Sequence, residues 1–298
     1  MKLGVVIPTK DRPEELRTIL RSIRAQSAHP AEIWVVDSSS DPVTGVVDEF
    51  GDIRVRYLRH AFPSASAQRN AGVRALSSEV ELVAFFDDDI TLEPGAISAV
   101  YEYWASAPKD VAGCTLNWVN FEQTPAQALK RSRFVEWLGM YSGRPGAVMP
   151  SGWHTPIGRV SENRFVDWIP SLASVWRRQV LMTFGFEERF EGYSYLEDLD
   201  FSLSVREANH RLAVLADAGF LHLNSPKGRV SFLRFGQSEV ENRVFIVRKH
   251  RLSMSRCLLG LTGRLLATTV SGVLGRERRL LDRVLGNCVG LVRVALDS

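Results

Sequence analysis

Cysteine is scarce in this sequence, and no two cysteines form a C-x-x-C pair. The 298 residues contain three cysteines, Cys114, Cys257 and Cys288. This odd, widely spaced set excludes a disulfide framework and a structural zinc cluster, and a chain of this kind is expected in the reducing cytosol. An apolar run of only five residues precedes Pro8, too short for the apolar core of a signal peptide. We therefore expect a cytoplasmic protein.

The sequence also lacks a long uninterrupted apolar run. Its most apolar stretch, Leu258–Leu274, has 17 residues and contains Arg264 and three glycines, short of the ~20 uninterrupted apolar residues that a spanning helix requires. We expect this stretch to be interfacial or packed.

The charge of the chain is divided unevenly. Residues 226–298 have nine more basic than acidic side chains, whereas residues 1–225 have six more acidic than basic ones. A basic tail around an apolar segment can make a peripheral contact with an anionic membrane surface; alternatively, its helices pack on the rest of the chain or on a second subunit. No nucleic-acid-binding motif accompanies the basic residues, so we expect no nucleic acid partner.

Short apolar segments alternate with amphipathic ones over the first hundred residues. Strands are predicted at Leu3–Ile7, Glu32–Val36, Val55–Leu58 and Leu82–Phe86, and helices at Pro13–Ala25, Ser64–Leu76 and Pro94–Trp104. This alternation is typical of βαβ units on a parallel sheet. The length suits one large α/β domain with a modest appendage.

Periodicity is weak between residues 113 and 176, where we expect loops. This interval contains five of the seven tryptophans, Trp118, Trp137, Trp153, Trp168 and Trp176. They are either core and loop anchors or part of a sugar-stacking surface. Regular patterns return with helices at Arg178–Thr183 and Glu197–Asn209, strands at Leu212–Leu215 and Phe220–Leu223, and helices from Phe232 onward.

Three consecutive aspartates, Asp87, Asp88 and Asp89, follow the fourth predicted strand directly. Adjacent carboxylates repel one another, so the cluster is either solvated at a turn or neutralised by a cation; oxygen ligands favour Mg²⁺ or Mn²⁺. The first strand leads into Pro8-Thr9 and the second into Asp37, although each of these residues could be an ordinary turn former. Because ligands bind beyond the carboxyl ends of parallel strands, the set predicts a nucleotide pocket.

Several short motifs follow one another along residues 3–223. They are Val5–Pro13, Glu32–Ser40, Gln68–Gly72, Phe85–Asp89, Arg177-Arg178, Phe184–Phe190, Glu197–Asp200 and His222. This series resembles the successive blocks of family 2 glycosyltransferases, which have the α/β fold called GT-A. The resemblance implies a GT-A catalytic domain at 1–225, with a nucleotide-binding half at 1–112 and an acceptor-binding half at 113–225. Residues 226–298 would form a basic, helical C-terminal extension.

The resemblance also implies a role for individual residues. The nucleotide-binding residues would be Pro8, Thr9, Arg12, Asp37, Arg69, Asp87 and Asp88. Asp89 would bind Mn²⁺ or Mg²⁺, and His222 is either a further metal ligand or a structural histidine. Asp198 would be the catalytic base. Acceptor or sugar contacts would come from Trp153, Trp168 and Glu197.

The chemistry of sugar transfer requires the same kinds of group. Negative charge develops on the departing diphosphate, where a metal can stabilise it, and the attacking hydroxyl needs a carboxylate base. Glu197 and Asp198 begin a predicted helix, whose N-terminus favours their charge; the plain alternative is an acidic first turn that only stabilises its helix.

We therefore expect a metal-dependent, inverting transferase of a hexosyl or deoxyhexosyl group. It would take the sugar from a nucleotide-diphosphate donor to a carbohydrate or lipid-linked acceptor, in polysaccharide or glycolipid synthesis, in the cytoplasm or at the inner face of the cell membrane. One alternative is a nucleotidyltransferase that makes a sugar nucleotide, but Pro8–Asp11 is not the glycine-rich phosphate loop such enzymes use. Another is a sugar-nucleotide-binding protein without turnover, against which the intact acidic set argues.

Overall fold

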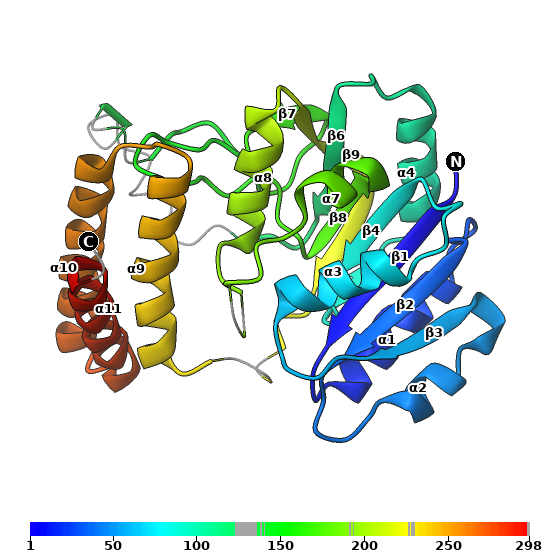
Figure 1. The fold of residues 1–298 in the computed structure, drawn as a ribbon, viewed down its shortest axis with the longest axis horizontal. Coiled ribbons are helices and arrows are strands. Elements are labelled where there is room, and N and C mark those ends of the chain that lie inside the picture. Colours follow the sequence, from blue (N-terminus) through cyan, green and yellow to red (C-terminus); the bar gives the residue numbers. More distant parts are fainter. Residues whose placement is uncertain are drawn as a thin grey trace. The chain divides into compact units, whose positions relative to one another are not determined.

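The computed structural model describes residues 1–296 except 123–135, 138, 140, 191, 193, 226 and 228–229. The chain forms two compact units: unit 1 is Met1–Gln123 with Ile157–Gly228, and unit 2 is Thr124–Pro156 with Arg229–Ser298. Unit 1 contains the sheet and unit 2 the three C-terminal helices (Figure 1). The predicted boundary at residue 225 lies near the end of the second segment of unit 1.

Unit 1 is built on one nine-stranded sheet. Its strands are β1 Leu3–Thr9, β2 Glu32–Asp37, β3 Val55–Arg59, β4 Leu82–Phe86, β5 Ile90–Leu92, β6 Val111–Trp118, β7 Arg164–Val166, β8 Ala173–Arg177 and β9 Arg211–His222. They lie in the order β3-β2-β1-β4-β8-β6-β9-β5, with β7 also paired to β9. The first four in this order are mutually parallel, and β8 is antiparallel to both neighbours. As a result β6, like β9, runs in the direction of β4.

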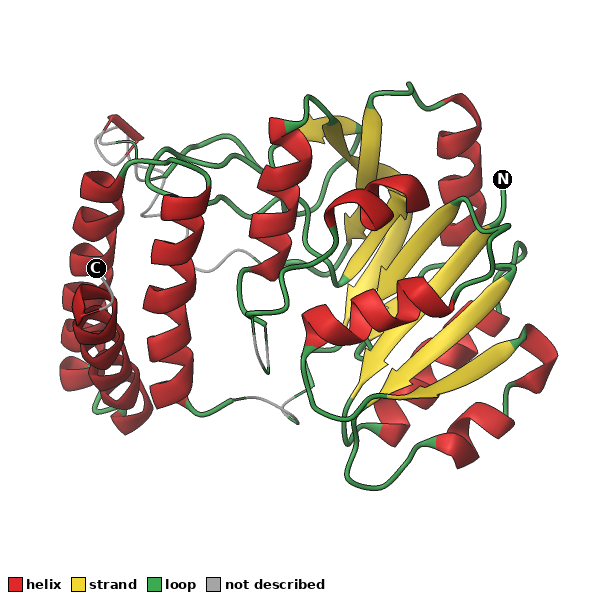
Figure 2. Ribbon diagram, viewed as in Figure 1, coloured by secondary structure: helices red, strands yellow, loops and turns green. Residues whose placement is uncertain are grey.

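Helices cover both faces of this sheet (Figure 2). The helices of unit 1 are α1 Pro13–Arg24, α2 Thr44–Asp48, the 3₁₀ helix η1 Gly51–Ile53, α3 Ala65–Ala75, α4 Ala96–Ser106, α7 Arg178–Phe184 and α8 Glu197–Glu207. One hydrophobic cluster joins α1, α2 and α4 to one face, and another joins α3, α7 and α8 to the other. All seven residues of β1 are therefore buried, as expected of a parallel strand with both faces covered.

The predicted strands and helices of the first hundred residues are confirmed to within about two residues at each end. A short helix, α2, and a short strand, β5, were not predicted. The weakly periodic interval, where loops were expected, contains most of β6 and of β8 and all of β7. The two strands expected at Leu212–Leu215 and Phe220–Leu223 were wrong: they are one strand, β9. The irregularity in its pattern is a register shift against β6 between Thr115 and Asn117, not a chain break.

The C-terminal part of unit 2 forms the helices α9 Phe232–Lys249, α10 Met254–Leu274 and α11 Arg278–Leu296, as the sequence predicted for the tail. Glycines bring α9 and α11 together: a Cβ on Gly286 would lie 2.1 Å from the carbonyl oxygen of Leu233. The fully buried Glu239 of α9 accepts two hydrogen bonds from Arg283 of α11, at 3.0 and 2.7 Å. This pair joins α9 to α11 through a buried charge, and a second cation, Arg264 of α10, lies 3.6 Å from the same carboxylate.

Candidate active site

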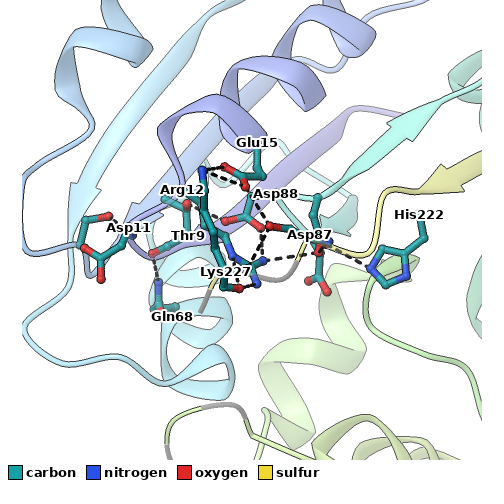
Figure 3. Close-up of polar contacts among 12 residues, drawn as sticks. Thr9, Asp11, Arg12, Glu15, Gln68, Asp87, Asp88, His222 and Lys227 are labelled. Carbon is teal, nitrogen blue, oxygen red and sulfur yellow. Dashed lines mark hydrogen bonds and ion pairs between the residues drawn. The ribbon is translucent and has the colours of Figure 1, made fainter. Parts of the chain in front are cut away.

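The parallel strands β1, β2 and β4 end at one edge of the sheet. Figure 3 shows the side chains of Thr9, Arg12, Asp87, Asp88 and His222 there. Pro8 and Thr9 are the last residues of β1 and pair with Val36 and Asp37 of β2. The aspartate cluster follows β4 directly. This edge is where an open α/β sheet binds its ligands.

Asp88 is the most deeply buried member of the aspartate cluster, at 3% exposed against 6% for Asp89. Its carboxylate accepts a hydrogen bond of 2.8 Å from the Thr9 hydroxyl and another of 2.8 Å from the Arg12 guanidinium. Burial raises the pKa of Asp88 to about 7, although Arg12 and Thr9 both favour the ionised form. Arg12 also donates to the backbone carbonyl of Lys227, so it links the aspartate cluster to the segment after β9 (Figure 3).

Asp89 lies against His222, the last residue of β9. Its Oδ1 is 3.2 Å from Nε2 of His222, and its Oδ2 accepts a 3.2 Å hydrogen bond from the backbone N–H of Ser225. Arg12 Nη1 is 3.5 Å from the same Oδ2. Burial raises the pKa of Asp89, but His222, Arg12 and the Ser225 N–H outweigh it and hold the pKa below its usual value.

His222 is held in place by a side chain that sequence reasoning missed. The Asn120 amide accepts a hydrogen bond from the backbone N–H of His222 and donates one to its carbonyl, both at 3.0 Å. The same amide oxygen accepts from the indole N–H of Trp118 at 2.9 Å, and the Trp118 ring meets the imidazole edge-on at 5.1 Å between centroids. The only sequence signal that could have pointed to Asn120 was its position, with Trp118, just after an apolar segment. Both residues lie in the interval that was predicted to form loops.

The chemistry of Asp89 and His222 fits a divalent cation. A carboxylate oxygen and an imidazole nitrogen at 3.2 Å are two ligands that Mn²⁺ accepts, and Nδ1 of His222 is buried without a hydrogen-bond partner. Among the residues that the structure describes, no group of three or more His, Cys, Asp or Glu side chains could hold a metal. A cation here would therefore take its remaining ligands from water or from donor phosphates, as Mg²⁺ and Mn²⁺ commonly do.

Asp37 is fully buried at the end of β2. Its two carboxylate oxygens accept hydrogen bonds from the backbone N–H groups of Ser39 and Val43, the hydroxyl of Tyr57 and the guanidinium of Arg59, at 2.8 to 3.3 Å. Three of these donors bind Oδ2 and one binds Oδ1. The buried Asp37 therefore holds the loop that follows β2.

Arg69 of α3 is almost fully buried and joins the two acidic motifs. One guanidinium nitrogen donates to Asp87 at 2.9 Å and another donates to Glu197 at the start of α8. Burial raises the pKa of Glu197 above its ordinary value, and Arg69 opposes that rise. Arg69, predicted near the base or diphosphate, and Glu197, predicted as a sugar contact, are therefore partners of each other.

Asp198 follows Glu197 in the first turn of α8. Leu196, just before the helix, has a left-handed backbone conformation with φ of 73°. The Asp198 side chain is partly exposed and accepts a 2.8 Å hydrogen bond from the Leu199 N–H. Burial raises its pKa to about 6, while the Leu199 N–H and the charge of Arg69 restrain the rise. A carboxylate with such a pKa is ionised at neutral pH and basic enough to accept a proton.

The two tryptophans predicted as sugar contacts are both buried. Trp153 is 4% exposed and packs in unit 2, where the guanidinium carbon of Arg243 lies 3.8 Å from the centre of its ring. Trp168, after β7, is 7% exposed. Stacking on a sugar requires an open ring face, and neither indole offers one in this structure, which favours the alternative that they are core anchors.

The fold is that of the GT-A class of glycosyltransferases. The structure resembles a mannosyltransferase from Pyrobaculum calidifontis solved with GDP-Man and Mn²⁺, at a TM-score of 0.57 and 14% identity over 97% of this chain and 87% of that one. It also resembles S. aureus TarS solved with UDP-GlcNAc, at a TM-score of 0.55 and 16% identity over 95% of this chain and 79% of the other. At 14–16% sequence identity, these structural similarities establish the fold of this chain.

The sequence places the chain more narrowly. The model of the family described as Glycosyl transferase family 2 matches residues 4–161, more than half of the chain, and the chain belongs to this family. An O-antigen biosynthesis protein of Myxococcus xanthus is 25% identical over 76% of this chain. A GalNAc(5)-diNAcBac-PP-undecaprenol beta-1,3-glucosyltransferase of Campylobacter jejuni is 33% identical over 34% of it. The matches cover 18% and 34% of those two proteins, so the chain spans only part of their length.

Proposed function

We propose that this chain transfers a sugar from a nucleotide-diphosphate donor to an acceptor hydroxyl, with inversion at the anomeric carbon and with a bound Mn²⁺ or Mg²⁺. The observation that supports this best is the bridge made by Arg69 between Asp87 of the aspartate cluster and Glu197 of the acid pair. The bridge brings the groups proposed to hold the donor next to the group proposed to take the acceptor proton. Family membership argues for this reaction over nucleotidyl transfer or binding without turnover.

Asp198 is the proposed catalytic base. As the acceptor oxygen attacks the anomeric carbon, its proton passes to the Asp198 carboxylate and the bond from that carbon to the diphosphate oxygen breaks. Attack opposite the leaving group inverts the anomeric configuration. With a pKa of about 6, Asp198 is ionised at neutral pH. This pKa is also close to the working pH, which favours efficient proton transfer.

Asp89 and His222 are the proposed metal ligands, and Mn²⁺ in the related fold of the Pyrobaculum mannosyltransferase supports this assignment. When bound, the cation would supply Lewis-acid stabilisation of the charge that develops on the diphosphate. Arg12, within 3.5 Å of both Asp88 and Asp89, places a second positive charge at the same point. No proton donor to the leaving group is then required.

The nucleotide is proposed to bind along the ends of β1, β2 and β4. Pro8, Thr9, Arg12, Asp87 and Asp88 would line this edge directly. Asp37 would contribute by holding the loop that follows β2, because its carboxylate is fully buried and already accepts four hydrogen bonds from the chain. Arg69 would position the acidic residues instead of contacting the diphosphate, because both of its terminal nitrogens already bind carboxylates.

The acceptor is proposed to be a carbohydrate or a lipid-linked saccharide of a cell-envelope polysaccharide or glycolipid, and the transferred group a hexose or deoxyhexose. The names of the Myxococcus and Campylobacter relatives, which refer to O-antigen synthesis and to an undecaprenol-linked saccharide, support this class. The enzyme would then work in the cytoplasm as a peripheral protein at the inner face of the membrane. Residues 1–225 remain the proposed catalytic domain and 226–298 its extension.

A panel of UDP-, dTDP- and GDP-sugars tests the proposal. We expect one donor to raise the melting temperature only with Mn²⁺ or Mg²⁺, and to be slowly hydrolysed without an acceptor. With an acceptor, NMR of the product should show an anomeric configuration opposite to that of the donor. Retained configuration, or pyrophosphate release from a nucleoside triphosphate and a sugar phosphate, would contradict the proposal.

A further inference from the structure

Helix α10 has its large apolar side chains on the outside. Its buried residues are mostly small: Cys257, Gly260, Leu261, Thr268 and Gly272. Its exposed apolar residues are larger and recur at helical spacing: Leu258, Leu259, Leu266, Val270, Val273 and Leu274, which are 43 to 79% exposed. We call these six residues the outer face of α10. A surface helix of a water-soluble domain normally has the opposite arrangement.

The packing of unit 2 fixes this orientation. A Cβ on Gly260 would lie 2.2 Å from the indole nitrogen of Trp153, and one on Gly272 would lie 2.9 Å from a methyl group of Leu281. At Gly260 and Gly272 the inner side of α10 therefore has no room for a larger side chain. Rotating the helix to bury its outer face would clash at both ends, so the outer face stays exposed unless something outside unit 2 covers it.

Positive charges stand at both ends of the outer face. Arg256 lies in the first turn of α10, and Arg276, Arg278 and Arg279 follow its last turn, all exposed. Helix α10 contains no Asp or Glu, and Glu277 is the single acidic residue between 251 and 281. The one cation in the middle of the helix, Arg264, is directed at the buried Glu239, 3.6 Å away. The outer face is thus an apolar band with cationic ends.

This pattern fits an anionic bilayer better than a second copy of the chain. Acyl chains would cover the apolar band, and lipid phosphates would meet the arginines at its ends. Pairing two copies of the outer face would bring arginines against arginines whether the helices ran parallel or antiparallel. The band therefore matches a surface that is apolar inside and negative at its border.

Helix α10 is also the one candidate membrane span among the described residues, with a mean hydropathy of 1.5 over its best window. It contacts α9 and α11 along its length. Crossing the bilayer would draw the charged surface of α11, including Arg279, Asp282 and Arg293, into hydrocarbon, which is costly. The geometry favours a helix that lies in the interface.

We propose that the outer face of α10 is a membrane-binding surface, which inserts its leucines and valines at the acyl-chain boundary of an anionic bilayer while Arg256, Arg276, Arg278 and Arg279 bind lipid phosphates. The proposal deepens the proposed function, since a lipid-linked acceptor would be presented at that surface. The proposed function explains why the protein would bind a membrane. The binding itself can be tested separately, because it is measured without any sugar.

Co-sedimentation of the full chain with vesicles tests the proposal. We expect binding to phosphatidylcholine vesicles that contain 30% phosphatidylglycerol, at least tenfold weaker binding to pure phosphatidylcholine, and weakening by 0.5 M NaCl. The double variant Leu266→Asn/Val270→Asn and the double variant Arg278→Glu/Arg279→Glu should each reduce binding at least tenfold. Met182→Asn, which changes a 60% exposed apolar residue of unit 1, is the matched control and should bind as the wild type does.

Metal-dependent donor hydrolysis without vesicles separates the two proposals. Both double variants should keep it, because they lie outside unit 1, and their melting temperatures should match the wild type. The membrane-surface proposal would be overturned if the chain hydrolyses the donor normally but shows no preference for anionic vesicles. It would also be overturned if the variants bind vesicles as the wild type does. Either result would leave the enzyme proposal intact. A third outcome is that the wild type does not bind vesicles but is a dimer in light scattering, while Leu266→Asn/Val270→Asn is a monomer. That result would assign the outer face to contact with a second copy of the chain.

Discussion

Arg69 and Glu197 are 128 positions apart in the sequence and share a buried hydrogen bond. The same guanidinium holds Asp87 at 2.9 Å, so one side chain of α3 ties the end of β4 to the start of α8. Both Nη atoms of Arg69 therefore donate to carboxylates. The guanidinium carbon also lies 5.8 Å from the centre of the Phe186 ring. The two acidic motifs therefore depend on a cation that belongs to neither of them.

Replacing Arg69 with methionine should destabilise the protein. The change leaves Glu197 buried with its charge unpaired, and breaking a buried ion pair in this way costs about 3–5 kcal/mol. Urea denaturation at pH 7.5 measures the loss. Arg74→Met on the same helix, 63% exposed and 4.0 Å from Glu188, should cost less than about 1 kcal/mol. Equal losses in the two variants would contradict the role of Arg69.

Replacing Asp198 with asparagine should abolish transfer and spare donor binding. The amide keeps the size of the side chain and can still accept from the Leu199 N–H, but it cannot take a proton from the acceptor. We expect kcat to fall at least a thousandfold, while the donor-induced shift in melting temperature with Mn²⁺ stays unchanged. Turnover near the wild-type rate would mean that another group is the base.

The pH dependence of kcat/KM should report the Asp198 carboxylate. Burial raises its pKa to about 6, so the base is protonated and inactive below that pH and ionised above it. The rate should rise tenfold per pH unit below about pH 6 and level off above it. Arg69 lowers this pKa, so Arg69→Met, measured on the folded fraction, should move the rising limb to higher pH. A limb that moves to lower pH, or does not move, would contradict the assignment.

The Asn120 side chain should matter for metal binding without touching the metal. In Asn120→Ala, the His222 N–H and carbonyl each lose the hydrogen bond to Asn120, and Trp118 loses its acceptor. Loss of such orienting contacts typically weakens metal binding 10- to 100-fold. Titration of Mn²⁺ by electron paramagnetic resonance, with the stabilising nucleoside diphosphate present, measures this. Asn163→Ala removes a comparable hydrogen bond to β9, at Ala216, and should leave Mn²⁺ affinity unchanged; an equal loss there would make the effect one of general stability.

The edge of the sheet could be predicted because its signal is local. Buried strands such as β1 and β4 are continuous apolar runs, and a polar residue directly after such a run must lie at the end of a strand. Thr9, Asp37 and Asp87 were therefore placed at one edge from the sequence. Long-range pairing has no comparable local signal, which is why β6 and β8 were missed and β9 was divided in two.

The sequence by itself determined the kind of chemistry, because acidic residues after parallel strands and at the start of a helix have their positions set by local backbone structure. Only the tertiary structure decided which of these groups are still available. Packing supplied Asp37 with four donors, turned Arg69 toward two carboxylates, buried Trp153 and Trp168, and placed mostly small residues inside α10 and most of its leucines outside. These outcomes depend on the volume and charge that distant segments bring to each side chain, and the order of residues along the chain does not reveal them.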